Sequence, residues 1–149
     1  MIIAVDFDGT CVENKFPDIG EEMPHCSQVL RNLVDDGHKL ILWTCREYCI
    51  YKGHNPLEEA YQWFTDRGVE ISAINYNPFI AHMGYPVARK CSADIYIDDC
   101  GIGIPRRPDG KIDWFAILPL VWDIERRLNK ECDYGKTTSK DCTQVHQEG

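Results

Sequence analysis

Three short apolar runs in this chain each end on polar residues, and this pattern constrains its fold more than any other feature. Residues 2–4 lead through Val5 into Asp6-Phe7-Asp8-Gly9-Thr10, residues 39–44 end on a hydroxyl, and residues 93–99 end on two carboxylates. Parallel strands that are buried on both faces appear as continuous apolar runs of this kind. Ligands of open α/β sheets bind at the carboxyl ends of the strands. The sequence therefore predicts a parallel sheet whose polar strand ends meet in one site.

The first run carries a pair of acidic residues. Residues i and i+2 of a strand point the same way, so we expect Asp6 and Asp8 to converge where the strand ends. Two such carboxylates repel each other, and one of them stays protonated unless a cation lies between them. A divalent metal relieves this repulsion and indicates chemistry on an anionic substrate. A solvated turn after the strand is the alternative, because Asp and Gly are ordinary turn residues.

Two helices and a fourth strand are expected between the runs. Residues 22–36 carry a single apolar stripe at helical spacing, with Pro24 in the first turn and Gly37 as the stop. A second helix is expected from Asn55, a good N-cap, to Gly68. Residues 70–75 are expected to form a short strand. The alternation predicts an α/β fold with a doubly wound, mostly parallel sheet and helices on both faces.

The last third of the chain predicts a turn, a helix and a tail. Two prolines and Asp109-Gly110 within residues 101–113 indicate a hairpin-like turn. A helix bent by Pro119 is expected from residue 114 to about residue 130. Residues 131–149 are polar and short of apolar residues, which is typical of a mobile tail. Residues 1–130 are then expected to form a single domain.

Composition and charge narrow the possible functions. The net charge of −8 argues against sequence-independent nucleic-acid binding, which needs Lys and Arg against the phosphates. No apolar stretch approaches the ~20 residues that span a bilayer. Asp6 and Asp8 interrupt the apolar N-terminal segment, so no signal peptide is expected either. The eight cysteines form no spaced disulfide framework, and we therefore expect free thiols in a reducing cytoplasm.

The motifs at the strand ends resemble those of a known enzyme superfamily. In order, the matching residues are Asp6-Phe7-Asp8-Gly9-Thr10, then Thr44, then Lys90, then Asp98-Asp99. They resemble the four motifs of the haloacid dehalogenase-like phosphohydrolases, over residues 1–99. Members of that superfamily often insert a cap domain, but residues 11–23 and 46–55 are only loop-sized here. The chain is thus similar to the small, capless bacterial members, and an open site is expected.

The resemblance implies a magnesium-dependent phosphomonoesterase that works through an aspartyl-phosphate intermediate. By resemblance, Asp6 is the nucleophile, and Asp8 is the acid that protonates the leaving oxygen and then the base that activates water. Asp8 must then be protonated at the first step. Magnesium accepts ligands that are all oxygen. The implied ligands are the Asp6 carboxylate, the Asp8 backbone carbonyl, and Asp98, with Asp99 bound directly or through water.

The resemblance also implies a phosphate-binding set, which consists of Gly9, Thr44, Cys45 and Lys90. Lys90 would offset the negative charge of the nucleophile and the phosphate. Arg46 and Arg89 are further candidates for this positive charge, and no feature of the sequence decides between them. The implied partner is a small phosphorylated substrate. Tyr61, Trp63 and the last helix make a homodimer a further expectation.

Several alternative functions stay open. Phosphotransfer to an acceptor other than water needs the same residues. A phospho-accepting regulatory domain also groups acidic residues, a Thr and a Lys around magnesium, but there the acidic pair ends the first strand, whereas Asp98-Asp99 comes late here. A non-catalytic module would be favoured if Asp6 or Asp8 were replaced, and neither is. A nucleotide-sugar transferase with a metal-binding Asp-x-Asp would need a longer chain.

Overall fold

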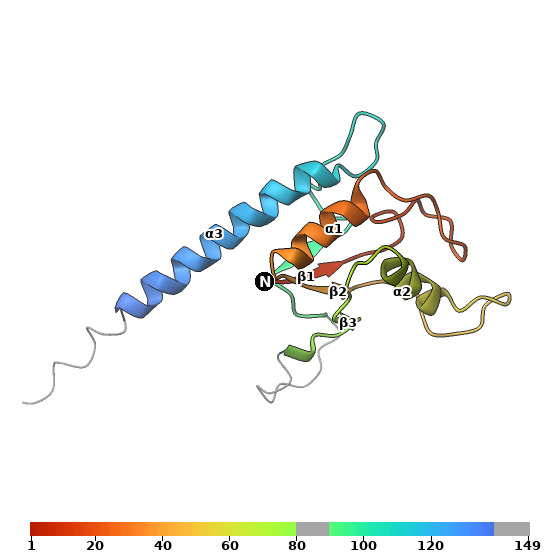
Figure 1. Cartoon of the computed structure of the whole chain (residues 1–149), viewed down its shortest axis with the longest axis horizontal. Coiled ribbons are helices and arrows are strands. Elements are labelled where there is room, and N and C mark those ends of the chain that lie inside the picture. The colour runs from red at the N-terminus through yellow and green to blue at the C-terminus, as the bar shows by residue number, and fades with distance from the viewer. Residues whose placement is uncertain (80–89, 139–149) are drawn as a thin grey trace, which may run out of the picture. The chain divides into compact units, whose positions relative to one another are not determined.

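The computed structural model describes residues 1–79 and 90–138, with side chains through residue 130. The chain forms two compact units, Met1–Leu118 and Pro119–Gly149. The first unit contains the sheet, the loops at its edges and two complete helices (Figure 1). The described part of the second unit is the continuation of the last helix.

The sheet of the first unit has four parallel strands, β1 (Ile2–Val5), β2 (Lys39–Leu42), β3 (Ala73–Ile74) and β4 (Ile95–Ile97), in the order β3-β2-β1-β4. The central strand β1 pairs with β2 through Ile3↔Leu40 and with β4 through Ile3↔Ile95. In both central strands the last three residues are apolar and buried, as strands covered on two faces must be, whereas Ile2 is half-buried and Lys39 is exposed. The predicted α/β fold with a parallel sheet is confirmed.

Strands β2, β3 and β4 are shorter than the segments that predict them. Strand β2 ends at Leu42, two residues before Thr44, and β3 covers only two of the six residues expected. Backbone bonds nevertheless continue past the strand ends, since Trp43 N–H donates to the Val5 carbonyl and Asp6 N–H to the Ile97 carbonyl. The polar residues that follow β1, β2 and β4 therefore reach one edge of the sheet in register.

Helices α1 (Cys26–Asp35) and α2 (Pro56–Asp66) connect β1 to β2 and β2 to β3. Both connections lead toward the β3 edge of the sheet, from β1 to β2 and from β2 to β3. Because crossovers between parallel strands are right-handed, the two helices lie on the same face of the sheet. They are neighbours there, because Arg31 of α1 donates a 2.7 Å hydrogen bond to the Arg67 carbonyl directly after α2. The aromatic ring of Phe7 packs between this layer and the sheet, 5.5 and 5.6 Å from the rings of Trp63 and Phe64.

The start of α1 differs from the prediction, whereas the start of α2 agrees with it. Helix α1 begins at Cys26 rather than residue 22, because His25 adopts a left-handed conformation (φ 67°) that helical backbone cannot continue through. Helix α2 begins at Pro56 after Asn55, as predicted, although the Asn55 side chain bonds Glu58 and caps no backbone N–H.

The segment between β4 and the last helix turns back on itself, as predicted. Arg106 and Ile112 form an antiparallel bridge, and Arg107 N–H donates to the Lys111 carbonyl. Helix α3 (Trp114–Thr138) follows and contains Pro119. Its end at Thr138 shows that the predicted helix end near residue 130 was wrong, whereas the mobile tail over residues 131–149 stays a prediction. Residues 139–149 lie outside the described part of the chain.

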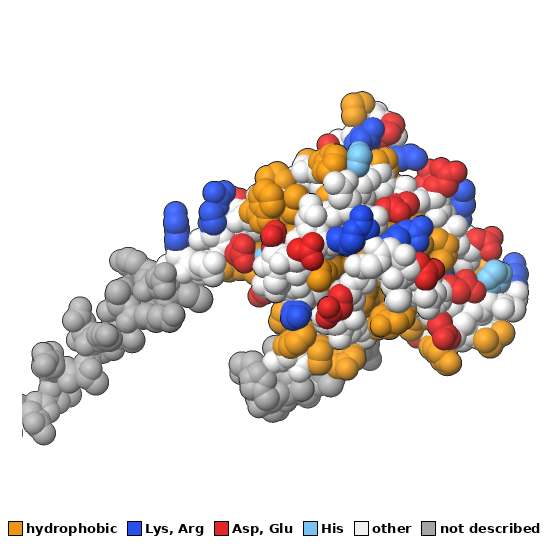
Figure 2. Space-filling view, in the orientation of Figure 1, with side chains coloured by type: hydrophobic (Ala, Val, Ile, Leu, Met, Phe, Trp, Pro, Cys, Tyr) orange, Lys and Arg blue, Asp and Glu red, His pale blue; other side chains and the backbone are white. Residues whose placement is uncertain are grey.

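The segments where a cap domain could be inserted, residues 11–23 and 46–55, contain isolated bridges but no helix or longer strand. Among the described helices, none is long and apolar enough to cross a membrane. On the face in view in Figure 2, acidic and basic side chains are interspersed and no continuous basic patch forms.

Candidate active site

A cavity of about 370 Å³ opens at the carboxyl edge of the sheet. Polar residues from all four strand ends meet in it: Asp6 after β1, Thr44 after β2, Asn75 after β3 and Asp98 after β4. The complete lining is Asp6, Trp43, Thr44, Cys45, Glu47, Asn75 and Asp98. The structure therefore brings together four of the predicted site residues, Asp6, Thr44, Cys45 and Asp98, although their catalytic and binding roles remain predictions.

Asp6 is the half-buried acid of this cavity. Burial, together with the nearby negative charges of Asp98 and Asp99, raises the pKa of Asp6 to about 6. Hydrogen bonds from the Thr10 hydroxyl and the Phe7 backbone oppose this rise in pKa. Asp6 therefore lies among other carboxylates and forms no ion pair with a Lys or Arg of the described residues, which is the electrostatic situation that a metal ion relieves.

Thr10 links two of the acidic residues, and sequence reasoning gave it no role. Its hydroxyl donates a 2.8 Å hydrogen bond to Asp6 Oδ2 and accepts a 2.9 Å hydrogen bond from the backbone N–H of Asp99. The Thr10 side chain is fully buried, and its carbonyl accepts a hydrogen bond from the Trp114 indole. Thr10 thus fixes Asp6 relative to the loop after β4. The sequence feature that could have pointed to a role for Thr10 is its position in the run Asp8-Gly9-Thr10.

Asp98, Asp99 and the thiol of Cys100 offer ligand atoms within 4.8 Å of one another. One carboxylate oxygen of Asp98 accepts the Cys100 backbone N–H at 2.8 Å, which holds that side chain beside the turn. The two negative carboxylates raise the pKa of the Cys100 thiol, which disfavours its thiolate form. The remaining donors are oxygens, and with Asp6 beside them they suit a hard divalent cation such as Mg²⁺.

Gly9 is required where the loop after β1 meets Asp99. A Cβ at this position would lie 2.6 Å from Asp99 Oδ2 and 2.9 Å from its Cγ, and φ is +89°. Only glycine tolerates both the left-handed backbone and this close approach. Gly9 does not line the cavity, so its observed contribution is to let the Asp99 carboxylate pack against the backbone of the first motif.

Asp8 does not share the cavity with Asp6. Its two carboxylate oxygens accept hydrogen bonds from Arg46 Nε and Nη2, both at 2.7 Å, in a bidentate ion pair. The expected convergence of Asp6 and Asp8 was therefore wrong for the side chains: after Val5 the chain turns, and each carboxylate finds its own partner. The physical reason is that strand geometry, which makes i and i+2 parallel, ends at Val5.

Arg46 is the residue near the candidate site that the sequence analysis most underestimated. Its side chain is only 1% exposed, although it carries a charge. Besides the ion pair, it donates to the backbone carbonyls of Pro17, Asp18 and Pro56. Its guanidinium carbon lies 5.1 Å from the Phe7 ring centre and 5.5 Å from that of Phe16. Only the fold brings these groups together, since they come from three separate segments.

Thr44 is held in place by a residue that was not predicted. The side chain of Asn75 accepts a hydrogen bond from Thr44 N–H at 2.9 Å and donates one to its carbonyl at 3.0 Å. The Thr44 hydroxyl accepts the backbone N–H of Arg46 at 3.1 Å. Asn75 directly follows β3 and is the last residue of the strand expected over residues 70–75, but the sequence analysis gave its side chain no role.

The cavity lacks the expected lysine. Lys90 is exposed, and its ammonium lies 4.9 Å from the ring centre of Tyr96. None of the described residues that line the cavity is Lys or Arg, while Glu47 adds a further carboxylate. A phosphate-binding role for Lys90 stays a prediction, and Arg89 lies outside the described residues.

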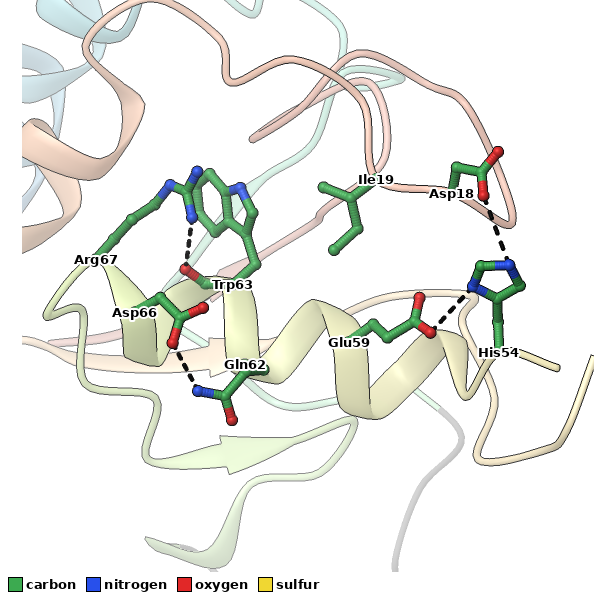
Figure 3. Close-up of a pocket in the computed structure, with 8 residues that line it drawn as sticks. All are labelled: Asp18, Ile19, His54, Glu59, Gln62, Trp63, Asp66 and Arg67. Atoms are coloured by element: carbon green, nitrogen blue, oxygen red, sulfur yellow. Dashed lines mark hydrogen bonds and ion pairs between the residues drawn. The ribbon is translucent and has the colours of Figure 1, made fainter.

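A second cavity, of about 470 Å³, lies beside α2 (Figure 3). On one side His54 bridges Asp18 and Glu59, and on the other the Arg67 guanidinium stacks 4.1 Å from the centre of the Trp63 ring (Figure 3). Arg67 also forms a 2.8 Å ion pair with Glu22. No predicted site residue lines this cavity.

A solved structure from Bacteroides thetaiotaomicron, described as a conserved protein coded by locus, is similar to this chain. The two share 40% sequence identity over 83% of this chain and 90% of that one, with a TM-score of 0.66. This chain belongs to the same family as that Bacteroides protein. The family likeness supports the α/β fold with its parallel sheet. The sequence matches no model of a known protein family and no curated protein.

Proposed function

We propose that this protein is a magnesium-dependent phosphohydrolase of the haloacid dehalogenase-like type, with Asp6 as nucleophile. The observation that carries the proposal is the position of Asp6: half-buried, at the end of the central strand, with its pKa raised to about 6 by burial and by the adjacent Asp98 and Asp99. An anionic nucleophile in such a place needs a divalent cation, and the same cation attracts a phosphoryl group.

The oxygens of Asp6, Asp98 and Asp99 would hold Mg²⁺, with the Asp8 backbone carbonyl as the further ligand that the resemblance implies. Bound there, the ion supplies positive charge to the phosphoryl oxygens, in a cavity whose described lining has no basic side chain.

The chain's own residues then have separate tasks. Thr10 aims the Asp6 carboxylate through its 2.8 Å hydrogen bond. Asp6 attacks phosphorus to give an aspartyl phosphate, which water hydrolyses. Thr44, fixed by Asn75, and the backbone near Cys45 contribute hydrogen bonds to the phosphoryl oxygens. The resemblance assigns the proton transfers to Asp8.

The test is phosphate release from a panel of phosphorylated compounds, measured in excess chelator and after magnesium is restored. We expect turnover only with magnesium, and trapping with fluoroberyllate should place the adduct on Asp6. Full activity in chelator would refute the metal assignment, and an adduct on another residue would refute the nucleophile. Transfer of the phosphoryl group to an added alcohol, with little free phosphate, would favour the phosphotransferase.

The proposed activity includes a substrate class, a location in the cell and an oligomeric state. We infer a small phosphorylated substrate, because the cavity has a volume of about 370 Å³, and a cytoplasmic location, because the six cysteines of the described side chains are free. Without a cap, a second copy of the chain could shield the site, which makes a homodimer a prediction. Sedimentation at high micromolar concentration tests it, and a monomer there would contradict it.

A further inference from the structure

The candidate active-site cavity has a deep end and a mouth. Asp6 and Asp98 are half-buried where β1 and β4 end, whereas along the loop after β2 the lining passes from half-buried Thr44 to exposed Cys45 and Glu47. In the proposed function the phosphoryl group lies against Asp6, at the deep end. The organic part of the substrate, which departs with the leaving oxygen, therefore extends toward the mouth, where Glu47 lies.

The carboxylate of Glu47 is free. In the part of the chain that the structure describes, its side chain has no ion pair and no hydrogen bond. Other acidic side chains near the loops are paired, since Glu13 meets Lys111 at 2.8 Å and Glu22 meets Arg67 at 2.8 Å. A free carboxylate on an open surface is ordinary, but one that lines a ligand cavity attracts a cationic ligand group and repels an anionic one.

The cavity is also short of positive charge. Asp6, Asp98 and Glu47 contribute carboxylates to the lining, and none of the described lining residues is Lys or Arg. The ammonium of Lys90 lies 4.9 Å from the ring centre of Tyr96, and Lys90 does not line the cavity. One magnesium ion does not neutralise these carboxylates together with a phosphate dianion. The negative charge that remains favours a substrate with a positive charge of its own.

Trp43 adds an aromatic residue to the same lining. It is half-buried and packs against the buried cluster of Ile41, Ala73 and Cys91. Among aromatic side chains, the indole of Trp attracts organic cations most strongly. The lining thus combines a free carboxylate with an indole, and both groups suit an organic ammonium ion.

We propose that the substrate is a phosphomonoester whose leaving group carries an ammonium group, as the phosphates of amino alcohols do, and that Glu47 selects it. This inference rests on the proposed function and names its substrate class. Glu47 attracts the ammonium group and takes no part in the bonds that form and break. The cation is present in the ground state and the transition state alike, so the preference appears in KM.

The experiment compares two esters of the same shape on the wild-type protein with magnesium. Phosphocholine carries a quaternary nitrogen, and 3,3-dimethylbutyl phosphate has a neutral carbon in its place. We expect KM to be ~3–30-fold lower for phosphocholine, the combined size of a cation–aromatic contact and an exposed charge pair. The charge also makes choline the better leaving group, which changes kcat. The ratio of the two KM values is therefore the measurement.

Glu47→Gln removes the charge and keeps the shape of the side chain. We expect it to lower the KM preference for phosphocholine by ~2–5-fold, the share of an exposed charge pair. Glu70→Gln is the matched control, because Glu70 is exposed, has no partner among the described residues and lines neither cavity. It makes the same change in net charge and should leave the KM ratio at its wild-type value.

Failure of this substrate class and failure of the proposed function give different results. Equal KM values for the two esters in the wild type, or equal changes of their ratio in Glu47→Gln and Glu70→Gln, would overturn the substrate class while the phosphohydrolase stands. Magnesium-dependent release from aryl or sugar phosphates, with none from phosphocholine, would do the same. No magnesium-dependent release from any of these compounds would overturn the proposed function, and the substrate class with it.

Discussion

The side-chain amide of Asn75 pairs with both backbone groups of Thr44, accepting from its N–H at 2.9 Å and donating to its carbonyl at 3.0 Å. Beyond Leu42, where β2 ends, the amide thus supplies to Thr44 the two hydrogen bonds that a neighbouring strand would otherwise make. It thereby fixes the loop that carries Thr44 and Cys45 into the cavity. Asn75 itself has a left-handed backbone (φ 55°), which Asn tolerates better than most residues.

Asn75→Gly removes the amide while it keeps the left-handed backbone accessible. We expect kcat/KM of the proposed phosphatase to fall by ~10–100-fold, the usual effect of losing a residue that orients site groups. Asn75→Ala adds backbone strain and should be less stable than the glycine variant. Equal activity of the glycine variant and the wild type would show that Thr44 needs no such support.

Gly9→Ala should damage the site by forcing Asp99 away. The new Cβ would lie 2.6 Å from Asp99 Oδ2, a distance that requires the carboxylate or the loop to move. Gly37→Ala is the control, because Gly37 has nearly the same φ (+86°) and nothing within 4 Å of its new Cβ. Both variants carry the left-handed cost of about 1–2 kcal/mol. Calorimetry with Mg²⁺ should show weaker binding for Gly9→Ala alone; equal affinities would remove Asp99 from the metal site.

Thr10→Val keeps the shape of the side chain but removes the hydroxyl between Asp6 and the Asp99 backbone. The Asp99 N–H loses its acceptor, so we expect the free energy of unfolding to fall by roughly 1–3 kcal/mol in urea titrations. The pKa of Asp6 should rise further, because the Thr10 hydrogen bond lowers it. Thr65→Val removes an exposed hydroxyl on α2 that bonds its own helix, and it should cost less than Thr10→Val.

Asp6→Asn should stabilise the metal-free protein at neutral pH. Burial raises the pKa of Asp6 from 3.8 to about 6, so the folded protein binds a proton that the unfolded chain has released. The contribution of this group to stability therefore falls as pH rises from about 4 to about 6, and it stays low above that. We expect the variant to exceed the wild type by roughly 1–3 kcal/mol at pH 7.5 and to lose this advantage toward pH 4.

Thermal unfolding from pH 4 to 8 in chelator measures this difference. Magnesium should reverse it at pH 7.5, because the wild type gains more from the ion than the asparagine variant does. A difference between the two proteins that is independent of pH would mean that Asp6 is not the group with the raised pKa.

Much of the fold follows from short-range patterns. The apolar runs around Ile3 and Ile41 predict buried parallel strands, and Asn55-Pro56 predicts the start of α2, because burial on two faces and helix-start chemistry act within a few residues. The start of α1 was missed because the left-handed backbone of His25 is set by its surroundings. The end of α3 was missed because the residues after 130 are mostly polar, and a polar segment has no apolar stripe from which a helix can be predicted.

The sequence by itself determined which acids and hydroxyls stand at the ends of the strands, because strand and polar end are adjacent in the chain. Only the tertiary structure decided their partners. Asp8 pairs with Arg46, 38 positions away, and Asp99 bonds Thr10, 89 positions away. Hydrogen bonds and ion pairs depend on ångström distances between groups from separate segments, and the packing of the loops around the sheet sets these distances.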